Sequence, residues 1–390
     1  MKRPNSSLVL TGLLAFSLAS CGKTNHASDV KGHFENSTSA AAKAYVNQQT
    51  IAPEWAPSQA VIVSSALMDS YGREDLVKAI VDAGVESVWV AVPRGSSTST
   101  NTSTFSSLRQ ILGSDMSHVK AIPEAASGSP TVWARDWSPL GAKTENGDIH
   151  LLDLNYYPER PSDDSMARAL ESSMGMTRVS LPVYNEGGNF MTNSRGECLM
   201  TTRVTDANAE QIVSGDMILS ASQIQGYYKD FGGCKKLTIF PRMPTEKTGH
   251  IDMWGKFLDD DTIVVNEISD ATLGYATSSS EKSFAKMIQT FTNQRAADVA
   301  ALGYKVIRLP MPLPVQGNYR SYTNSLLVNG TAIIPQYVDD GYADSEERQN
   351  YETKVASIYS SLGYKVSWIP ADELIAAGGA IHCVTMQVPK

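Results

Sequence analysis

Residues 355–370 read VASIYSSLGYKVSWIP, and this stretch shows the unit from which the fold is built. Its apolar residues recur from Val355 at i, i+3, i+4 and i+7, which is the spacing of one face of an α-helix. Gly363 then suits the left-handed conformation of a helix C-cap, and a β-forming run ends at Pro370, which cannot continue strand pairing. The stretch therefore predicts a helix, a turn and a strand in succession.

Four other stretches repeat this order along the chain. They span residues 76–93, 166–182, 224–241 and 284–310, with expected cap glycines at Gly84, Gly175, Gly232 and Gly303 and closing prolines at Pro93, Pro182, Pro241 and Pro310. Five helix-to-strand units predict an α/β fold of five modules arranged about an axis. A two-domain α/β protein in which the units recur by coincidence is the alternative interpretation.

Polar residues occur at similar places in these modules. Glu186, His250, Asn324 and Cys383 each follow the closing proline of their module by 4 to 14 residues. Asp136 belongs to the first module, after an insertion that contains the Ser/Thr-rich run 96–107. Equivalent positions of separate modules would converge on one site, which favours a single folded domain.

The segment Gly378-Gly379-Ala380-Ile381-His382-Cys383-Val384-Thr385 is the strongest candidate for a nucleophile. Two glycines let the backbone approach a ligand closely, and β-forming residues follow the cysteine, so we expect Cys383 at the end of a strand. The alternative is an inert cysteine in the core, because free cysteine is among the most buried residue types.

His250 and Asp252 form a second motif. In a strand, residues i and i+2 point to the same face, so both side chains would enter one space while Ile251 packs behind them. The pair could act as an acid/base beside a binding carboxylate or as two metal ligands. No His-x-x-x-His or Cys-x-x-Cys spacing accompanies it, so we predict no metal.

Two further segments carry polar residues beside tryptophan or glycine. Asp136 lies between the indoles of Trp133 and Trp137, where it could serve a ligand or form an ion pair with Arg135 in an aromatic core. The run 185–189, Asn-Glu-Gly-Gly-Asn, suits a backbone that approaches a ligand, or else a simple turn.

The composition is that of a globular protein. The chain has 390 residues, of which 42% are hydrophobic and 19% charged, enough to bury a large core. Its net charge of −8 disfavours nucleic acid as a partner, because nucleic-acid binding depends on basic patches. A cationic substrate would suit this charge.

The N-terminal residues 1–21 have the order of a lipoprotein signal peptide. Lys2 and Arg3 precede an apolar run from 8 to 18, which is too short to span a bilayer, and Leu-Ala-Ser-Cys at 18–21 resembles a lipoprotein cleavage box. We expect Cys21 to be lipidated and to anchor the exported protein to a bacterial membrane, with an ordinary signal peptide as the alternative. The polar composition of residues 22–50 predicts a flexible tether, and we expect one folded domain over 51–390.

Three cysteines remain after Cys21. An odd number in an oxidising compartment suggests one disulfide and one free thiol. We predict that Cys198 pairs with Cys234 and that Cys383 stays free.

Together, residues 133–136, 186–189, 249–252 and 379–383 resemble the motifs of the guanidine-modifying enzymes, specifically the agmatine deiminase and Porphyromonas-type peptidylarginine deiminase family. The resemblance spans residues 55–387. It implies a five-bladed α/β-propeller with pseudo-fivefold symmetry. It also implies hydrolysis of a guanidinium to a ureido group with release of ammonia, without metal or cofactor.

The resemblance assigns a role to each motif residue. Asp136 and Asp252 would hold the planar guanidinium through charge-assisted hydrogen bonds. Cys383 would add to its central carbon, His250 would act as acid and base, and Glu186 would support His250. Trp133, Arg160, Asn189 and Asn324 are expected to contact the substrate.

The two aspartates create an electrostatic conflict with a thiolate. Negative charge beside Cys383 raises the pKa of its thiol, so we expect a protonated thiol in the empty site unless His250 is cationic. A bound guanidinium would relieve the conflict.

The choice of substrate depends on fewer residues. Arg160 matches the first residue of an Arg-Pro-Arg element that grips a substrate carboxylate in the peptidylarginine group, whereas Ser162 replaces the second arginine. Asn189 and the run 322–325 are similar to the same group, and export also favours peptide or protein arginine, whether terminal or internal. Agmatine is the alternative substrate, and an inactive propeller that binds arginine-containing ligands is the alternative from another class.

Overall fold

The computed structural model describes residues 44–315, 317–338 and 341–390. The expected signal peptide 1–21 with Cys21, and the expected tether as far as residue 43, lie outside the described residues.

The folded body begins earlier than the expected boundary at Ile51. Strand β1 (Gln49–Ile51) pairs antiparallel with β5 (Leu140–Thr144), and the Asn47 amide donates to the Asp230 carbonyl at 2.6 Å. The ring of Tyr45 packs edge-on against His150 with centroids 5.0 Å apart. Residues 44–50 therefore belong to the body and not to the tether.

The described residues form a mixed α/β fold with five separate sheets. In each sheet an antiparallel strand borders two parallel strands that are joined through a helix. The sheet of β2 has β4 (Val119–Pro123) as a further parallel strand, and the sheet of β5 has β1 as a further antiparallel strand. The antiparallel strands are β17 (Met386–Pro389), β5, β8 (Met191–Thr192), β11 (Gly255–Phe257) and β14 (Leu326–Val328). The parallel pairs are β2 (Ser58–Ser64) with β3 (Ser87–Val92), β6 (Ile149–Asn155) with β7 (Thr177–Tyr184), β9 (Glu197–Thr201) with β10 (Lys236–Phe240), β12 (Thr262–Glu267) with β13 (Lys305–Pro310), and β15 (Thr331–Gln336) with β16 (Lys365–Pro370).

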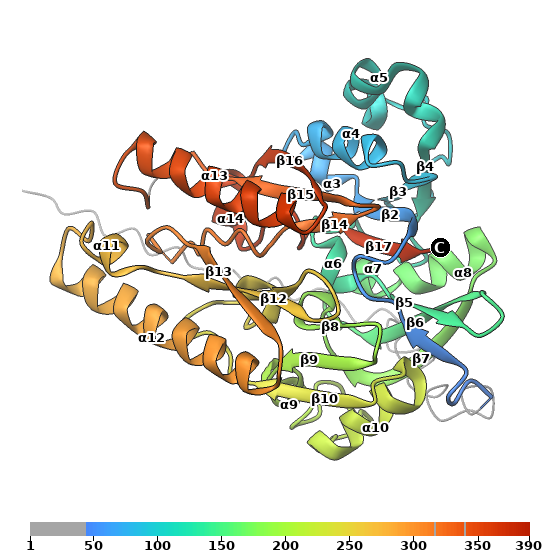
Figure 1. Cartoon of the computed structure of the whole chain (residues 1–390). Coiled ribbons are helices and arrows are strands. Elements are labelled where there is room, and N and C mark those ends of the chain that lie inside the picture. The colour runs from blue at the N-terminus through green and yellow to red at the C-terminus, as the bar shows by residue number, and fades with distance from the viewer. Residues whose placement is uncertain (1–43, 316, 339–340) are drawn as a thin grey trace, which may run out of the picture.

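The helices of the five modules lie on the outside of the molecule, around the sheets (Figure 1). They are α4 (Glu74–Asp82), α8 (Met166–Met174), α10 (Ala221–Gly232), α12 (Ser279–Ala301) and α13 (Ser345–Ser361). The other elements are β4 (Val119–Pro123), α5 (Ser106–Leu112) and the short helices α3 (Ala66–Asp69), α6 (Ala134–Trp137), α7 (Pro161–Asp164), α9 (Arg203–Ala207), α11 (Asp270–Leu273) and α14 (Asp372–Ala377).

The predicted ends of the modules need two corrections. Gly232 is not a cap glycine: it lies inside α10, and Gly233, with φ 69°, occupies the left-handed cap position. A side chain at 232 would meet Ile51 at 2.8 Å, so Gly232 serves close packing instead. Pro182 does not end β7, which continues to Tyr184 across an irregularity in its pairing with β6.

The first sheet is completed by the other end of the sequence. Its order is β17-β2-β3-β4, so Met386–Pro389 lies beside a strand that begins at Ser58. The strand interiors are buried apolar residues, as in β3, where all six residues are buried. Burial of this apolar surface is the main source of stability for the sheets.

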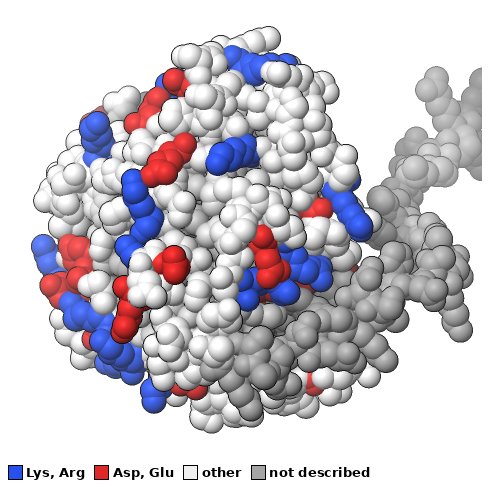
Figure 2. All heavy atoms as spheres, turned by 90° about the vertical axis from the view of Figure 1, so that its right-hand side faces the viewer, with Lys and Arg blue, Asp and Glu red and all other residues white. Residues whose placement is uncertain are grey.

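On the face shown in Figure 2, positive and negative side chains are interspersed. Within the described part of the chain, no helix has the length and apolar content needed to cross a membrane.

Candidate active site

The site lies where five chain segments meet, and each segment leads into the antiparallel strand of a different sheet. Asp136 lies in α6 before β5, Glu186 precedes β8, Asp252 precedes β11, Asn324 precedes β14 and Cys383 precedes β17. The repeated module therefore places one polar residue after another at the same structural position.

Cys383 lies in a turn that leads into β17, not at the end of a strand as expected. Its side chain is buried, with Sγ 3.1 Å from Asn324 Nδ2 and 3.7 Å from Asp252 Oδ2. Burial raises the pKa of the Cys383 thiol well above its usual value, and the carboxylates of Asp252 and Asp136 raise it further. The thiol is therefore protonated in the empty site.

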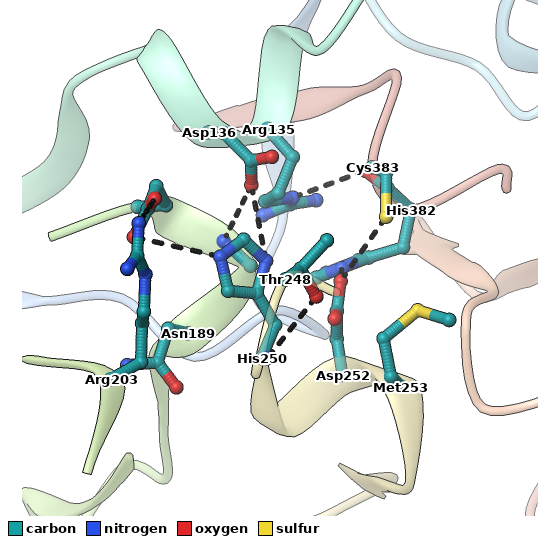
Figure 3. A network of polar contacts seen from close by, with 12 residues as sticks. Arg135, Asp136, Asn189, Arg203, Thr248, His250, Asp252, Met253, His382 and Cys383 are labelled. Atoms are coloured by element: carbon teal, nitrogen blue, oxygen red, sulfur yellow. Dashed lines mark hydrogen bonds and ion pairs between the residues drawn. The ribbon is translucent and has the colours of Figure 1, made fainter. Parts of the chain in front are cut away.

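His250 lies between two carboxylates (Figure 3). Its Nδ1 is 3.6 Å from Asp136 Oδ1, and its Nε2 is 3.5 Å from Glu186 Oε2. Burial alone would lower the pKa of His250, but the two carboxylates outweigh burial and raise the pKa to about 10. His250 is thus a cation at neutral pH and can donate a proton.

Asp136 has the opposite balance of burial and charge. Burial raises the pKa of its carboxyl to about 7, although His250 and a hydrogen bond from the Gly188 amide, 3.2 Å from Oδ1, act to lower it. Neighbouring groups of the protein thus compensate the negative charge of the Asp136 carboxylate only in part.

Gly188 lies next to the side chains of His250, Asp136 and Asp252. A Cβ at this position would lie 2.7 Å from His250 Nδ1, 2.9 Å from Asp136 Oδ1 and 3.1 Å from Asp252 Oδ2. Only a residue without a side chain leaves room among the three polar groups. The glycine therefore belongs to the binding site.

Asp252 leaves one carboxylate oxygen without a hydrogen-bond partner among the described residues. Its Oδ2 receives hydrogen bonds from His382 Nδ1 at 2.7 Å and Asn324 Nδ2 at 3.1 Å, whereas its buried Oδ1 receives none. The expected strand is absent here, because residues Ile251–Met253 form a 3₁₀ helix and β11 starts only at Gly255. A buried, unpaired carboxylate oxygen is costly, so this atom is suited to accept from a ligand.

Two residues expected to contact the substrate make hydrogen bonds within the protein. Asn189 is fully buried, and its side-chain amide is bonded to Asn185 and to Thr201. Asn324 is also fully buried: its Oδ1 accepts from the amides of Ala380, His382 and Cys383, which holds the turn that carries the nucleophile.

Trp133 and Arg160 lie at the border of the site. A Cβ at Gly379 would lie 2.7 Å from both Trp133 Cζ3 and Cys383 Sγ, which places the indole beside the nucleophile. The guanidinium of Arg160 lies over the ring of Tyr157, 5.1 Å from its centroid, and donates to the Tyr156 hydroxyl at 3.2 Å.

The sequence-based reasoning missed four residues that support the site. Tyr157 and Arg203 donate to Glu186 Oε1 at 2.6 and 3.0 Å. Burial would raise the pKa of Glu186, but His250 and Arg203 outweigh it and lower that pKa to about 2. His382 contacts both Asp252 and Glu54, at 2.7 and 3.2 Å. For His382 a signal existed, because it precedes Cys383 directly in the sequence.

A disulfide joins Cys198 and Cys234, with sulfurs 1.97 Å apart, and Cys383 is free.

Across residues 44–315, 317–338 and 341–390, no group of three or more histidine, cysteine or acidic side chains is arranged to hold a metal ion.

A buried thiol, a cationic histidine and two carboxylates, of which Asp252 has one unpaired oxygen, define a cysteine-dependent hydrolase site for a planar cation. Comparison with known proteins gives the family. Residues 50–389 match the model of the Porphyromonas-type peptidyl-arginine deiminases, and the chain belongs to that family. It is an enzyme of the arginine/agmatine deiminase type.

Individual relatives are distant but cover most of the chain. A Shewanella baltica protein that carries the provisional name agmatine deiminase is 24% identical over 292 residues, which are 66% of this chain and 73% of that protein. The solved agmatine deiminases of Enterococcus faecalis and C. jejuni superpose with TM-scores of 0.66 and 0.65 at 18% and 17% identity, over 88% of this chain and 96% of each of theirs. The likeness to these structures shows a shared fold.

Proposed function

We propose that this enzyme hydrolyses the guanidinium of agmatine to a ureido group, giving N-carbamoylputrescine and ammonia. The observation that carries the proposal is the convergence of Asp136, His250 and Asp252 on Gly188, close to Cys383, whose Sγ lies 3.7 Å from Asp252 Oδ2. A guanidinium is planar and has N–H groups on its edges, so two carboxylates can hold it while sulfur approaches its carbon.

The first half of the reaction forms a bond to sulfur. The substrate cation offsets the two aspartates, which lets the Cys383 thiol release its proton to water, and this proton later leaves with the ammonia as ammonium. The thiolate adds to the central carbon, His250 donates a proton to the departing nitrogen, and the carbon–nitrogen bond breaks to release ammonia. The product of this half is a thiouronium on Cys383.

The second half consumes one water molecule. His250, now neutral, takes a proton from water as the oxygen adds to the thiouronium carbon. The carbon–sulfur bond then breaks, the ureido product leaves, and Cys383 and His250 return to their starting states. No electrons are gained or lost.

Agmatine differs from arginine in having no carboxylate, and the region of Arg160 supports this choice. Ser162 stands where the family pattern has a second arginine, and its buried hydroxyl contacts Glu124 Oε2. Burial, together with the nearby Asp163, raises the pKa of Glu124 to about 9. A substrate carboxylate would thus find one arginine beside a neutral carboxyl group, not two cations. The names of the relatives favour agmatine over the peptide substrate expected from the sequence.

Peptide or protein arginine is the second candidate, favoured by the description of the matching family and by the predicted export. We propose that the protein is exported and anchored through Cys21, because the Cys198–Cys234 disulfide suits an oxidising compartment. We also propose that residues up to 390 form one domain in which the five sheets are the blades of a pseudo-fivefold propeller. The repeated strand order supports this arrangement.

Ammonia release separates the candidates. The purified enzyme should be assayed with agmatine, with free arginine, and with peptides that carry arginine internally or at the C-terminus. We expect kcat/KM for agmatine to exceed the others by about tenfold or more, because the site pairs a carboxylate poorly. Higher kcat/KM for a peptide would overturn the agmatine assignment, and Cys383→Ala provides the blank.

A further inference from the structure

A second group of buried charges lies beside Cys383, and the reaction described above does not use it. We call Glu54, Lys256 and His382 the His382 group. His382 Nδ1 is 2.7 Å from Asp252 Oδ2, and its Nε2 is 3.2 Å from Glu54 Oε2. Lys256 Nζ is 2.5 Å from the same Glu54 oxygen. His382 and Lys256 are 3% and 2% exposed, so bulk water does not screen these contacts.

The geometry determines where the protons of His382 are. Each ring nitrogen faces a carboxylate oxygen, and an ionised carboxylate can only accept a hydrogen bond. Burial would raise the pKa of Glu54, but Lys256 and His382 outweigh it and hold that pKa well below its usual value. The pKa of Asp252 is likewise lowered against burial, chiefly by its hydrogen bond from His382. Each ring nitrogen of His382 thus faces a carboxylate oxygen that can accept a hydrogen bond from it.

We propose that His382 is a positioning residue for the deimination reaction: held as an imidazolium between Asp252 and Glu54, it fixes the Asp252 carboxylate for the guanidinium and keeps a positive charge next to Cys383. This role rests on the function proposed above. It is separate from the acid/base role of His250, because His382 has no free nitrogen with which to exchange protons with a substrate.

The surroundings of His382 support a lasting positive charge. Glu54 after β1 and Asp252 from η4 (Ile251–Met253) contact the ring of His382, Arg135 from α6 contacts its carbonyl, and Lys256 from β11 contacts Glu54. Arg135 Nε donates to the His382 carbonyl at 3.3 Å. Three cations thus face two carboxylates around the turn that carries the thiol, which partly offsets the effect of the aspartates on Cys383.

The protonation state can be read directly. In protein labelled with ¹⁵N-histidine, the His382 signals are identified by their loss in His382→Asn. We expect both ring nitrogens to be protonated at pH 7 in the wild-type protein without substrate. One protonated and one bare nitrogen at this pH would overturn the proposal.

The effect on the thiol is tested by the rate of iodoacetamide alkylation of Cys383 as a function of pH. In His382→Asn we expect the midpoint to move up by about one pH unit or more, and kcat/KM to fall about 100-fold as Asp252 loses its support. The matched control is His150→Asn, another buried histidine, bonded to the Gln49 side chain at 3.1 Å away from the site, which should leave both quantities unchanged.

A second variant covers the case in which His382→Asn fails to fold. The double change Glu54→Gln with Lys256→Met removes a buried pair together, so no unpaired charge is left. We expect His382 to lose one ring proton and the alkylation midpoint to rise again. If kcat/KM falls in these variants while the alkylation midpoint stays at the wild-type value, His382 is only structural. Neither readout requires a substrate, so a wrong substrate assignment would leave both results intact.

Discussion

The site contains two buried histidines, His382 and His250, and the carboxylates that contact them differ in how far other groups of the protein compensate their charge. His382 contacts Asp252 and Glu54 at 2.7 and 3.2 Å, and Lys256 completes the neutralisation of Glu54. His250 contacts Asp136 and Glu186 at 3.6 and 3.5 Å; Arg203 neutralises Glu186, but Asp136 keeps a pKa of about 7. Cations of the protein compensate the carboxylates around His382. The negative charge of Asp136 beside His250 is instead compensated in part by the cationic substrate.

The largest effect should come from removing the sulfur between the two histidines. Cys383→Ser should lower kcat by about 10⁴-fold or more, because neither histidine can replace the nucleophile. Agmatine should still bind and raise the melting temperature of the variant, since Asp136 and Asp252 remain. Ammonia release at more than a small fraction of the wild-type rate would contradict the covalent mechanism.

Filling the space on the His250 side should have the next largest effect. Gly188→Ala places a methyl group 2.7 Å from His250 Nδ1 and should lower kcat/KM about 100-fold. The control is Gly226→Ala in α10, where a Cβ meets no atom within 4 Å, so activity should persist and stability should rise by about 0.5–1 kcal/mol. Equal activity loss in both variants would show that the site does not extend to Gly188.

The pH profile distinguishes the partners of His250. We expect kcat/KM to fall below about pH 7 as Asp136 becomes protonated, and above about pH 10 as His250 loses its proton. Glu186→Gln removes a negative charge that raises the pKa of His250, so the alkaline limb should move to lower pH. An unchanged alkaline limb in this variant would show that another group controls it.

The smallest effect on catalysis should come from the disulfide, which lies away from both histidines. Replacing Cys198 and Cys234 by alanine opens a link between residues 36 apart and should lower the free energy of unfolding by about 3 kcal/mol. Denaturant unfolding measures this loss, and kcat/KM at 25 °C should match the wild type. A large loss of activity in the folded variant would show that the disulfide also positions the site.

The modular part of the fold could be predicted from the sequence because each module carries its own helical spacing, cap and strand. The convergence of the candidate site residues could be predicted because they follow the closing prolines of successive modules. The 3₁₀ helix at Ile251–Met253 was mistaken for a strand, because alternation over a few residues does not distinguish a strand from a tight turn.

The supporting residues could not be predicted in the same way. Glu54 lies more than 300 residues from His382 in the sequence, and only the assembled sheets bring them into contact. Asn189 and Asn324 adjoin the predicted catalytic motifs, and the sequence does not show that their amides also hold neighbouring loops through hydrogen bonds. A motif shows which side chains are near a site and not which direction they face.

The position of β17 has a consequence for biosynthesis. Cys383 precedes a strand that must pair with β2, a strand made more than 300 residues earlier. During translation the reactive sulfur therefore cannot reach its partners until Met386–Pro389 has left the ribosome and joined the first sheet. A nascent or prematurely stopped polypeptide would carry the clamp for the cation but no working nucleophile.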